Sequence, residues 1–204
     1  MTTRFWDGAV ATDWKLGVVR PRSEAPPDWA QYDDAALVEA CLAGHREAFE
    51  PLVERHRRQV YRVCFRFVGN HADASDLAQD AFIRAYRGLR GFKGKASIST
   101  WLYRIAVNVC LNRVASPPPR LAALDARGVH ATAEQPDTAL LRSERAAEVR
   151  AAIARLPPKQ RATLILRVYH ELPHEEIAAI LGSSVGAVKA NFFHALANLR
   201  KLLK

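Results

Sequence analysis

The sequence has 204 residues, 49% apolar and 25% charged, the balance of a folded protein with one ordinary domain or two small ones. No run of about 18 uncharged apolar residues occurs, and Asp7 and Asp13 interrupt any secretion signal, so we expect no membrane insertion and a cytoplasmic location. The net charge of +9 lies mainly in residues 33–115 (13 basic, 9 acidic) and 137–204 (11 basic, 6 acidic), which suits a polyanionic partner touched at two places.

The first 32 residues follow neither a helical nor a strand period. They contain Pro21, Pro26 and Pro27 and three tryptophans. Residues 1–32 are therefore expected to form a flexible N-terminal arm that can acquire order against a partner.

Residues 33–115 show a helical period almost throughout and predict a first domain. Asp33 or Asp34 can cap a short helix that Gly44 stops. Residues 49–67 place apolar side chains at helical spacing, which predicts an amphipathic helix of about 20 residues ended by Gly69 and Asn70.

Two more helices are expected before the linker. Ser75 or a neighbour starts one that runs through Leu89, and after a glycine-rich loop another runs from about Thr100 to Val114. Three consecutive prolines then end the helical pattern. Residues 116–136 lack periodicity and are too long for an ordinary loop of a compact domain, so they predict an interdomain linker.

Residues 137–204 predict a second helical domain. Asp137 caps a helix to about Ala154, and further helices are expected over 157–169, 173–181 and 184–203. Gly182 supplies a tight turn between the last two, which have the form of a helix-turn-helix. The fold class is therefore all-α, with two small helical domains joined by a flexible linker and a C-terminal helix-turn-helix.

The last helix has one apolar stripe. Its members are Val185, Val188, Phe192, Leu196, Leu199 and Leu203. Phe193 then falls on the other side among cationic residues, where it can contact a thymine methyl group in the major groove. The alternative is a plain helical hairpin with Phe193 packed inside.

Two features resemble catalytic or metal-binding sites, but a structural role explains each of them better. The run His170-Glu171-Leu172-Pro173-His174 has the H-E-x-x-H pattern of zinc proteases, but Pro173 cannot stand inside the single helical turn that such a site requires. The three cysteines are far apart among apolar residues and are expected to be buried thiols. We therefore expect no catalytic residues, no metal site and no cofactor.

Two segments carry a resemblance to one family. LPHEEIAAILGSSVGAVKANFFHALANLRKLL, from Leu172 to Leu203, resembles the C-terminal promoter-binding domain of extracytoplasmic-function sigma factors of the sigma-70 family. The preceding LPPKQRATLILRVYHEL resembles the helix that leads into that domain. Independently, DLAQDAFIRAYRGLRGFKGKASISTWLYRIAVNVCLNRV, from Asp76 to Val114, is similar to the N-terminal domain of the same sigma-E-like factors.

The resemblance implies a function and partners. It implies a non-enzymatic factor that binds RNA polymerase core, through the coiled coil of the largest subunit and the flap, and directs promoter recognition, opening and initiation. Residues 33–115 would be sigma domain 2, which binds core and recognises and melts the −10 element. Residues 137–204 would be sigma domain 4, which recognises the −35 element. A stress or envelope regulon and an anti-sigma partner are also implied.

The resemblance also assigns roles to residues. The polymerase-binding candidates lie along one side of the helix that starts near Ser75: Asp76, Gln79, Asp80 and Arg84. The −10 candidates are Phe92, Lys93, Lys95, Ser97, Trp101, Arg104 and Asn108, with Tyr103 also matching the melting helix. Asn108 would read a flipped base, because a base out of the stack exposes its Watson–Crick edge to an amide. Trp101 is equally suited to the core, and a surface or capping hydrogen bond is the alternative for Asn108.

The −35 candidates lie in the last helix: Ser184, Lys189, Ala190, Asn191, Phe193 and His194. Related sequences usually carry several arginines after the position of Lys189, and this chain does not. His194 adds charge only when protonated. The main rival is a helix-turn-helix regulator with a ligand-binding first domain, which leaves the similarity over Asp76 to Val114 to chance.

Overall fold

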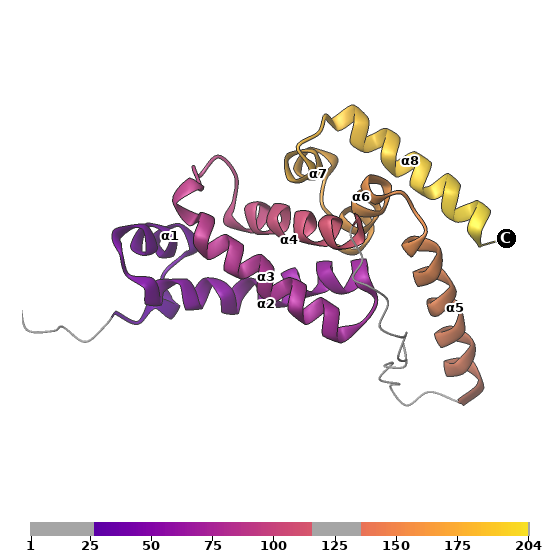
Figure 1. The fold of residues 1–204 in the computed structure, drawn as a ribbon, viewed down its shortest axis with the longest axis horizontal. Helices are drawn as coiled ribbons and strands as arrows, with labels where there is room; N and C mark the ends of the chain where they lie inside the picture. The colour runs from indigo at the N-terminus through magenta and orange to yellow at the C-terminus, as the bar shows by residue number, and fades with distance from the viewer. Residues whose placement is uncertain (1–26, 116–135, 204) are drawn as a thin grey trace, which may run out of the picture.

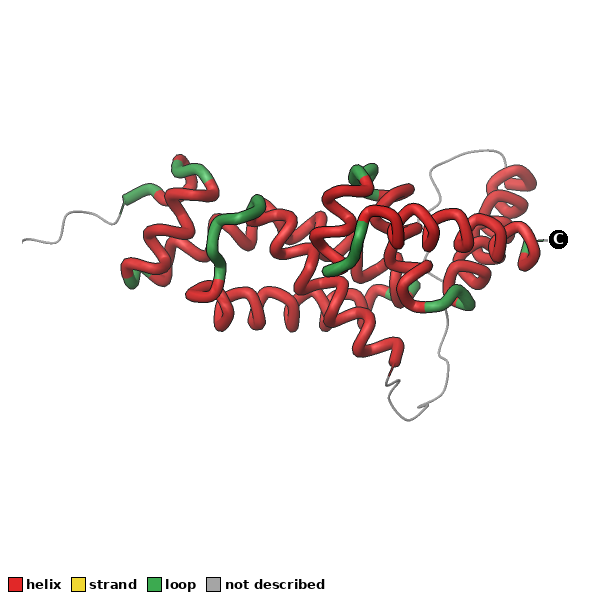
Figure 2. Tube along the Cα trace, turned by 90° about the horizontal axis from the view of Figure 1, so that it is seen from above, coloured by secondary structure: helices red, strands yellow, loops and turns green. Residues whose placement is uncertain are grey.

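A computed structural model describes residues 27–115 and 136–203. In the second range, the backbone is described from residue 136 and the side chains from Glu144. The predicted linker and most of the predicted N-terminal arm lie outside these residues. The described ranges contain helices and loops but no strand, as the all-α prediction requires (Figures 1 and 2). None of the described helices is long and apolar enough to cross a bilayer.

Eight α-helices make up the described chain. They are α1 (Asp34–Ala43), α2 (Phe49–Val68), α3 (His71–Gly88), α4 (Ile98–Ala115), α5 (Pro136–Ala154), α6 (Pro158–Tyr169), α7 (His174–Leu181) and α8 (Val185–Leu202). Short 3-10 helices cover Trp29–Gln31, Arg46–Ala48 and Leu89–Gly91. We call α1–α4 the N-terminal unit and α5–α8 the C-terminal unit.

Helix ends in the N-terminal unit follow capping chemistry. Asp33 accepts a hydrogen bond from the Ala36 amide at 2.8 Å and so caps α1, while Gly44 and Gly69 end α1 and α2 in the left-handed conformation. Asn70 was expected to help end α2, but its side chain accepts from the Asp73 amide at 2.8 Å and caps α3. The third helix therefore begins at His71, four residues before the expected start.

The last residues of the predicted arm are folded onto α2. The Arg55 guanidinium donates to the Ala30 carbonyl at 2.7 Å and to the Asp34 carboxylate at 3.0 Å. The Trp29 ring packs against Tyr32 and His45, each with 5.3 Å between ring centroids. Residues 29–32 thus belong to the surface of the N-terminal unit.

The helix-turn-helix forms as expected. Gly182, with φ of 58°, makes the turn after α7, and the Ser184 hydroxyl caps α8 by accepting from the Ala187 amide at 3.2 Å. The buried stripe of α8 differs from the prediction. Leu196 is 47% exposed, and Ala195 is fully buried beside Phe192 and Leu199. Each step of four residues moves a side chain about 40° around the helix axis, so the two steps from Val188 to Leu196 carry it off the buried face. The step of three residues from Phe192 to Ala195 returns to that face.

The two units are packed together. One continuous apolar core joins Phe67 of α2 and Val107 of α4 to Ile165 of α6 and Ile177 of α7. Figure 1 shows α7 and α6 lying across α4 and the end of α2. Helical periodicity had indicated which faces are apolar, and the structure shows that part of them is buried between the units.

Candidate nucleic-acid interface

The polymerase-binding candidates share one side of α3. Asp76, Gln79 and Arg84 are exposed, and Asp80 is half-buried. Asp80 and Arg84 already pair with each other one helical turn apart, with an Nη2–Oδ2 distance of 2.9 Å. A partner that binds here therefore meets a preformed ion pair.

Sequence reasoning missed an apolar member of this surface. Ile83 is 43% exposed and lies one turn beyond Gln79 on the same side of α3. Its position four residues after Gln79, which is about one helical turn, was the sequence signal that could have placed it on this side of the helix. Large exposed apolar side chains within a polar surface favour protein contacts, and Ile83 shares this side of α3 with Asp76, Gln79, Asp80 and Arg84.

The loop before α4 contains two exposed lysines and an aromatic pair. Lys93 and Lys95 are exposed on either side of Gly94, whose φ of 66° makes the loop turn. Phe92 packs on Trp101 with 5.3 Å between ring centroids, and both rings are half-buried. Trp101 thus serves the packing of the loop while part of its ring faces solvent.

Ser97 has a structural role at the start of α4. Its hydroxyl oxygen accepts from the Thr100 amide at 3.2 Å and lies 2.8 Å from the hydroxyls of Ser99 and Thr100. This is the geometry of a helix N-cap, and it explains why α4 begins at Ile98 rather than near Thr100. Contact with DNA would have to compete with these bonds.

Two candidates on α4 face solvent together. Arg104 and Asn108 are exposed and lie one turn apart. Within the described chain no hydrogen-bond partner is found for the side-chain amide of Asn108. The capping hydrogen bond considered for this side chain is therefore not seen there. Tyr103 behaves differently, since it is only 7% exposed and its hydroxyl lies 3.3 Å from His170 Nδ1 in the other unit.

The exposed side of α8 has the expected membership. Lys189, Ala190 and His194 are exposed, and Phe193 is 70% exposed with its ring 5.8 Å from that of His194. Asn191 is half-buried. Its neighbour Phe192 packs inward against His174. Phe193 points to a different side of α8 and is 70% exposed, so the alternative that packs Phe193 inside is excluded.

The H-E-x-x-H run lies between two helices. His170 follows the end of α6, Glu171 has a φ of 54°, and His174 begins α7. The histidines therefore do not share a helical face. Burial, together with the charges of Arg62 and Arg66, lowers the pKa of His170 to about 4, so its ring is neutral at pH 7.

Two family descriptions match the chain. Sigma-70 region 2 matches residues 52–116, and Sigma-70, region 4 matches residues 146–199. The first match contains α3, α4 and the loop with Lys93 and Lys95 between them, and the second contains α7 and most of α8. Together they cover more than half of the sequence.

The chain is also similar to curated proteins and a solved structure. It is 37% identical over 184 residues to the RNA polymerase sigma-H factor of Pseudomonas aeruginosa, covering 85% of this chain and 95% of that one. It is 35% identical over 175 residues to the ECF RNA polymerase sigma-E factor of Escherichia coli K12, covering 81% and 91%. The structure of CnrH in complex with the cytosolic domain of CnrY superposes with a TM-score of 0.60 at 26% identity, over 83% of this chain and 96% of CnrH.

Proposed function

Because the chain belongs to the sigma-70 family, in its extracytoplasmic-function group, we propose that its exposed surfaces divide the work of transcription initiation. The protein is a sigma factor, which binds RNA polymerase core and directs promoter recognition and opening. The observation that carries the division is the exposure of one polar face on each of α3, α4 and α8.

In this proposal residues 33–115 act as sigma domain 2. Asp76, Gln79, Asp80 and Arg84 dock α3 on the coiled coil of the largest polymerase subunit, and Ile83 adds apolar contact area. A large apolar side chain surrounded by an ion pair and an amide resembles a protein interface, with its apolar centre and polar rim, more than a merely solvated face.

The loop and α4 then capture the displaced strand. Lys93, Lys95 and Arg104 hold phosphates, while Asn108 reads the edge of a flipped base. Holding that strand stabilises the open promoter, and the proposal requires no catalytic step by the factor itself. Ser97 acts by capping α4, and Trp101 acts by supporting Phe92 in the loop.

Residues 137–204 act as sigma domain 4. Ser184 caps the recognition helix α8, and Lys189, Ala190, Asn191, Phe193 and His194 face the −35 duplex. Phe193 supplies an apolar contact in the major groove, and Lys189 supplies a charge to phosphate.

Use of both DNA surfaces on one promoter requires the units to separate. The −35 and −10 elements lie about 25 base pairs apart, which is about 85 Å at a rise of 3.4 Å per pair. In the structure α8 packs on α7 and α7 packs on α4, so two interaxial spacings place α4 and α8 roughly 20 Å apart. We therefore propose that the packed arrangement is the free form and that polymerase binding opens it.

The deciding experiment is affinity capture followed by run-off transcription. The chain should capture polymerase core and direct initiation at a promoter with separate −35 and −10 elements. A double variant, Asp76→Ala with Gln79→Ala, should weaken capture because it removes exposed polar contacts of α3. If the chain instead binds an operator specifically and core adds nothing, the helix-turn-helix regulator is the better description.

Lys189→Ala is expected to weaken −35 binding by a similar factor for every sequence, because a phosphate contact carries no base information. The slope of log affinity against log salt should fall by about one. Titration of −35 duplexes with holoenzyme at several salt concentrations measures both quantities. An unchanged salt slope for Lys189→Ala would show that Lys189 does not contact a phosphate.

Phe193→Ala should also lower the affinity for −35 duplexes without changing the circular dichroism spectrum, since that ring is 70% exposed.

An anti-sigma protein and a stress or envelope regulon complete the proposal. Their support is the similarity to extracytoplasmic-function sigma factors, and to CnrH, whose structure contains the cytosolic domain of CnrY. Capture of a polypeptide that blocks core binding by this chain would identify the partner.

A further inference from the structure

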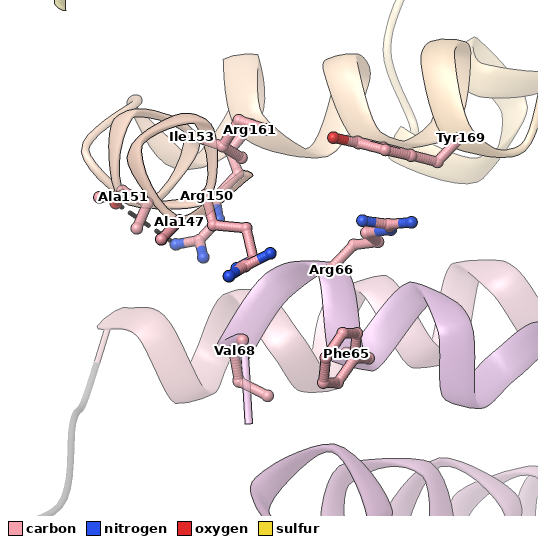
Figure 3. A pocket seen from close by; sticks show the side chains of 11 residues that line it. Phe65, Arg66, Val68, Ala147, Arg150, Ala151, Ile153, Arg161 and Tyr169 are labelled. Carbon is pink, nitrogen blue, oxygen red and sulfur yellow. Dashed lines mark hydrogen bonds between the residues drawn. The ribbon is translucent and has the colours of Figure 1, made fainter. Parts of the chain in front are cut away.

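A cavity of about 270 Å³ lies between the two units, at the end of α2 and beneath α5 and α6. Its walls come from both units, with Phe65, Arg66 and Val68 on one side and Arg150, Ile153 and Arg161 on the other. Figure 3 shows Arg150 and Arg161 reaching down from the C-terminal unit, with Arg66 facing them from α2. The cavity therefore exists only while the units are packed together.

Among the described residues, the walls contain three arginines and no carboxylate. None of these arginines takes part in an ion pair within the described chain. Guanidinium groups that converge without a counter-charge repel one another, and the repulsion grows as water is excluded. Where the two units meet, the positive charge of these arginines is therefore not balanced by a negative charge of the described chain.

Arg161 shows the same deficit at atomic level. The residue is only 6% exposed, and no described residue gives its Nε a hydrogen-bond partner. Its terminal nitrogens donate to backbone carbonyls only, those of Phe67 and, at 3.4 Å, of Ala154. Both terminal nitrogens are therefore occupied and the Nε is enclosed, so Arg161 adds a positive charge without a counter-charge beside the cavity.

The rest of the cavity is apolar and aromatic. The Arg66 guanidinium lies 4.0 Å from the centroid of the Tyr169 ring, which holds it at one wall. Phe65, Val68 and Ile153 supply apolar surface near the charges. Such a site suits a ligand with one anionic head and a compact apolar or planar body.

We propose that this cavity binds a small organic phosphate, with its phosphate group between Arg66 and Arg150, near the buried charge of Arg161, and its body against Phe65 and Val68. Arginine suits phosphate because its planar fork donates two hydrogen bonds at once. Phosphate also supplies enough oxygens to accept from more than one arginine, whereas the cavity volume limits the body to about one ring.

Binding there regulates opening, and this consequence rests on the proposed function. The ligand contacts both units, so it stabilises the packed arrangement by RT ln(1 + [L]/Kd). Promoter binding requires separation of the units. The ligand is therefore a negative effector that lowers the fraction of chain available to polymerase.

The test uses phenyl phosphate as probe, titrated calorimetrically into the full-length chain at constant ionic strength. Phenyl phosphate should bind, phenol should not, and inorganic phosphate should bind more weakly because it lacks the ring. Arg150→Gln should weaken phenyl phosphate binding about tenfold or more, as expected for loss of a charge-assisted hydrogen bond. Arg145→Gln, an exposed change on the same helix, is the matched control and should leave binding unchanged.

Three results would overturn the site. They are no binding of phenyl phosphate at millimolar concentration, equal binding of phenol, and equal binding by the Arg150→Gln variant. Arg66→Gln, on the other unit, repeats the test if Arg150→Gln alters the circular dichroism spectrum.

The regulatory step has its own readout. Saturating phenyl phosphate should reduce capture of polymerase core by the native chain and not by Arg150→Gln. Binding without reduced capture would refute the regulation and leave the site intact. Failure of the chain to capture core without any ligand would count against the proposed function, so the two failures are distinguishable.

Discussion

Phe67→Ala is expected to lower the free energy of unfolding by about 3–5 kcal/mol, as large-to-small changes of buried aromatic residues do. Phe67 is 1% exposed at the end of α2 and belongs to the core that joins the two units. The Arg161 guanidinium carbon lies 5.6 Å from the centroid of its ring. Truncation therefore leaves a cavity at the junction and removes a neighbour from a buried cation.

Urea unfolding followed by circular dichroism measures this loss. If the units share one core in solution, the variant should unfold in one transition at lower urea. Hydrogen exchange should then become faster in both α2 and α6. Ile83→Ala is the matched control, because that side chain is 43% exposed and its loss should change stability by no more than about 0.5 kcal/mol. Faster exchange confined to α2 would show that the units fold independently.

The helices could be predicted because their ends carry local chemistry. Gly44, Gly69 and Gly182 adopt the left-handed conformation that ends a helix, and Pro158 occupies the first turn of α6. Errors arose where one residue serves two elements. Asn70 follows the end of α2 and caps α3, and a pattern of apolar spacing shows only the first of these roles.

Packing between the units could not be predicted in the same way. Periodicity shows that a helix has an apolar face, but it does not name the surface that covers it. Tyr103 illustrates the limit, since it was matched to the melting helix and is buried against His170 from the other unit. Arg161 is a second case, because a basic residue in an amphipathic helix is expected at the surface and this one is 6% exposed.

Exposure of the candidate sites was easier to anticipate than their membership. Phe193 faces solvent, in agreement with the helical spacing that separated it from the apolar stripe, and so do Arg104 and Asn108, which the resemblance had singled out. Ile83 was missed because an apolar residue on an apolar-rich helix is assigned to the core by default. The DNA and polymerase contacts of all these residues remain predictions.

Asn108→Ala is expected to relax the base preference at one position of the −10 element by about 1–3 kcal/mol, the usual worth of a good base contact. The residue is exposed on α4, one turn from Arg104, and no hydrogen-bond partner for its amide is found in the described chain. An amide so placed is free to pair with the edge of a flipped base. Its loss should spare the fold, because no packing contact is removed from the core.

Permanganate footprinting of promoter opening, across single-base variants of the −10 element, separates the roles open to this side chain. With Asn108→Ala holoenzyme, discrimination should fall at one position and persist at the others. Binding of −35 duplex should not change, since α8 makes that contact. Asn112→Ala, the same substitution one turn further along α4 at another exposed position, is the control and should preserve the ranking. An unchanged ranking for Asn108→Ala would remove it from the site, and a uniform loss over all variants would mean that it supports the fold.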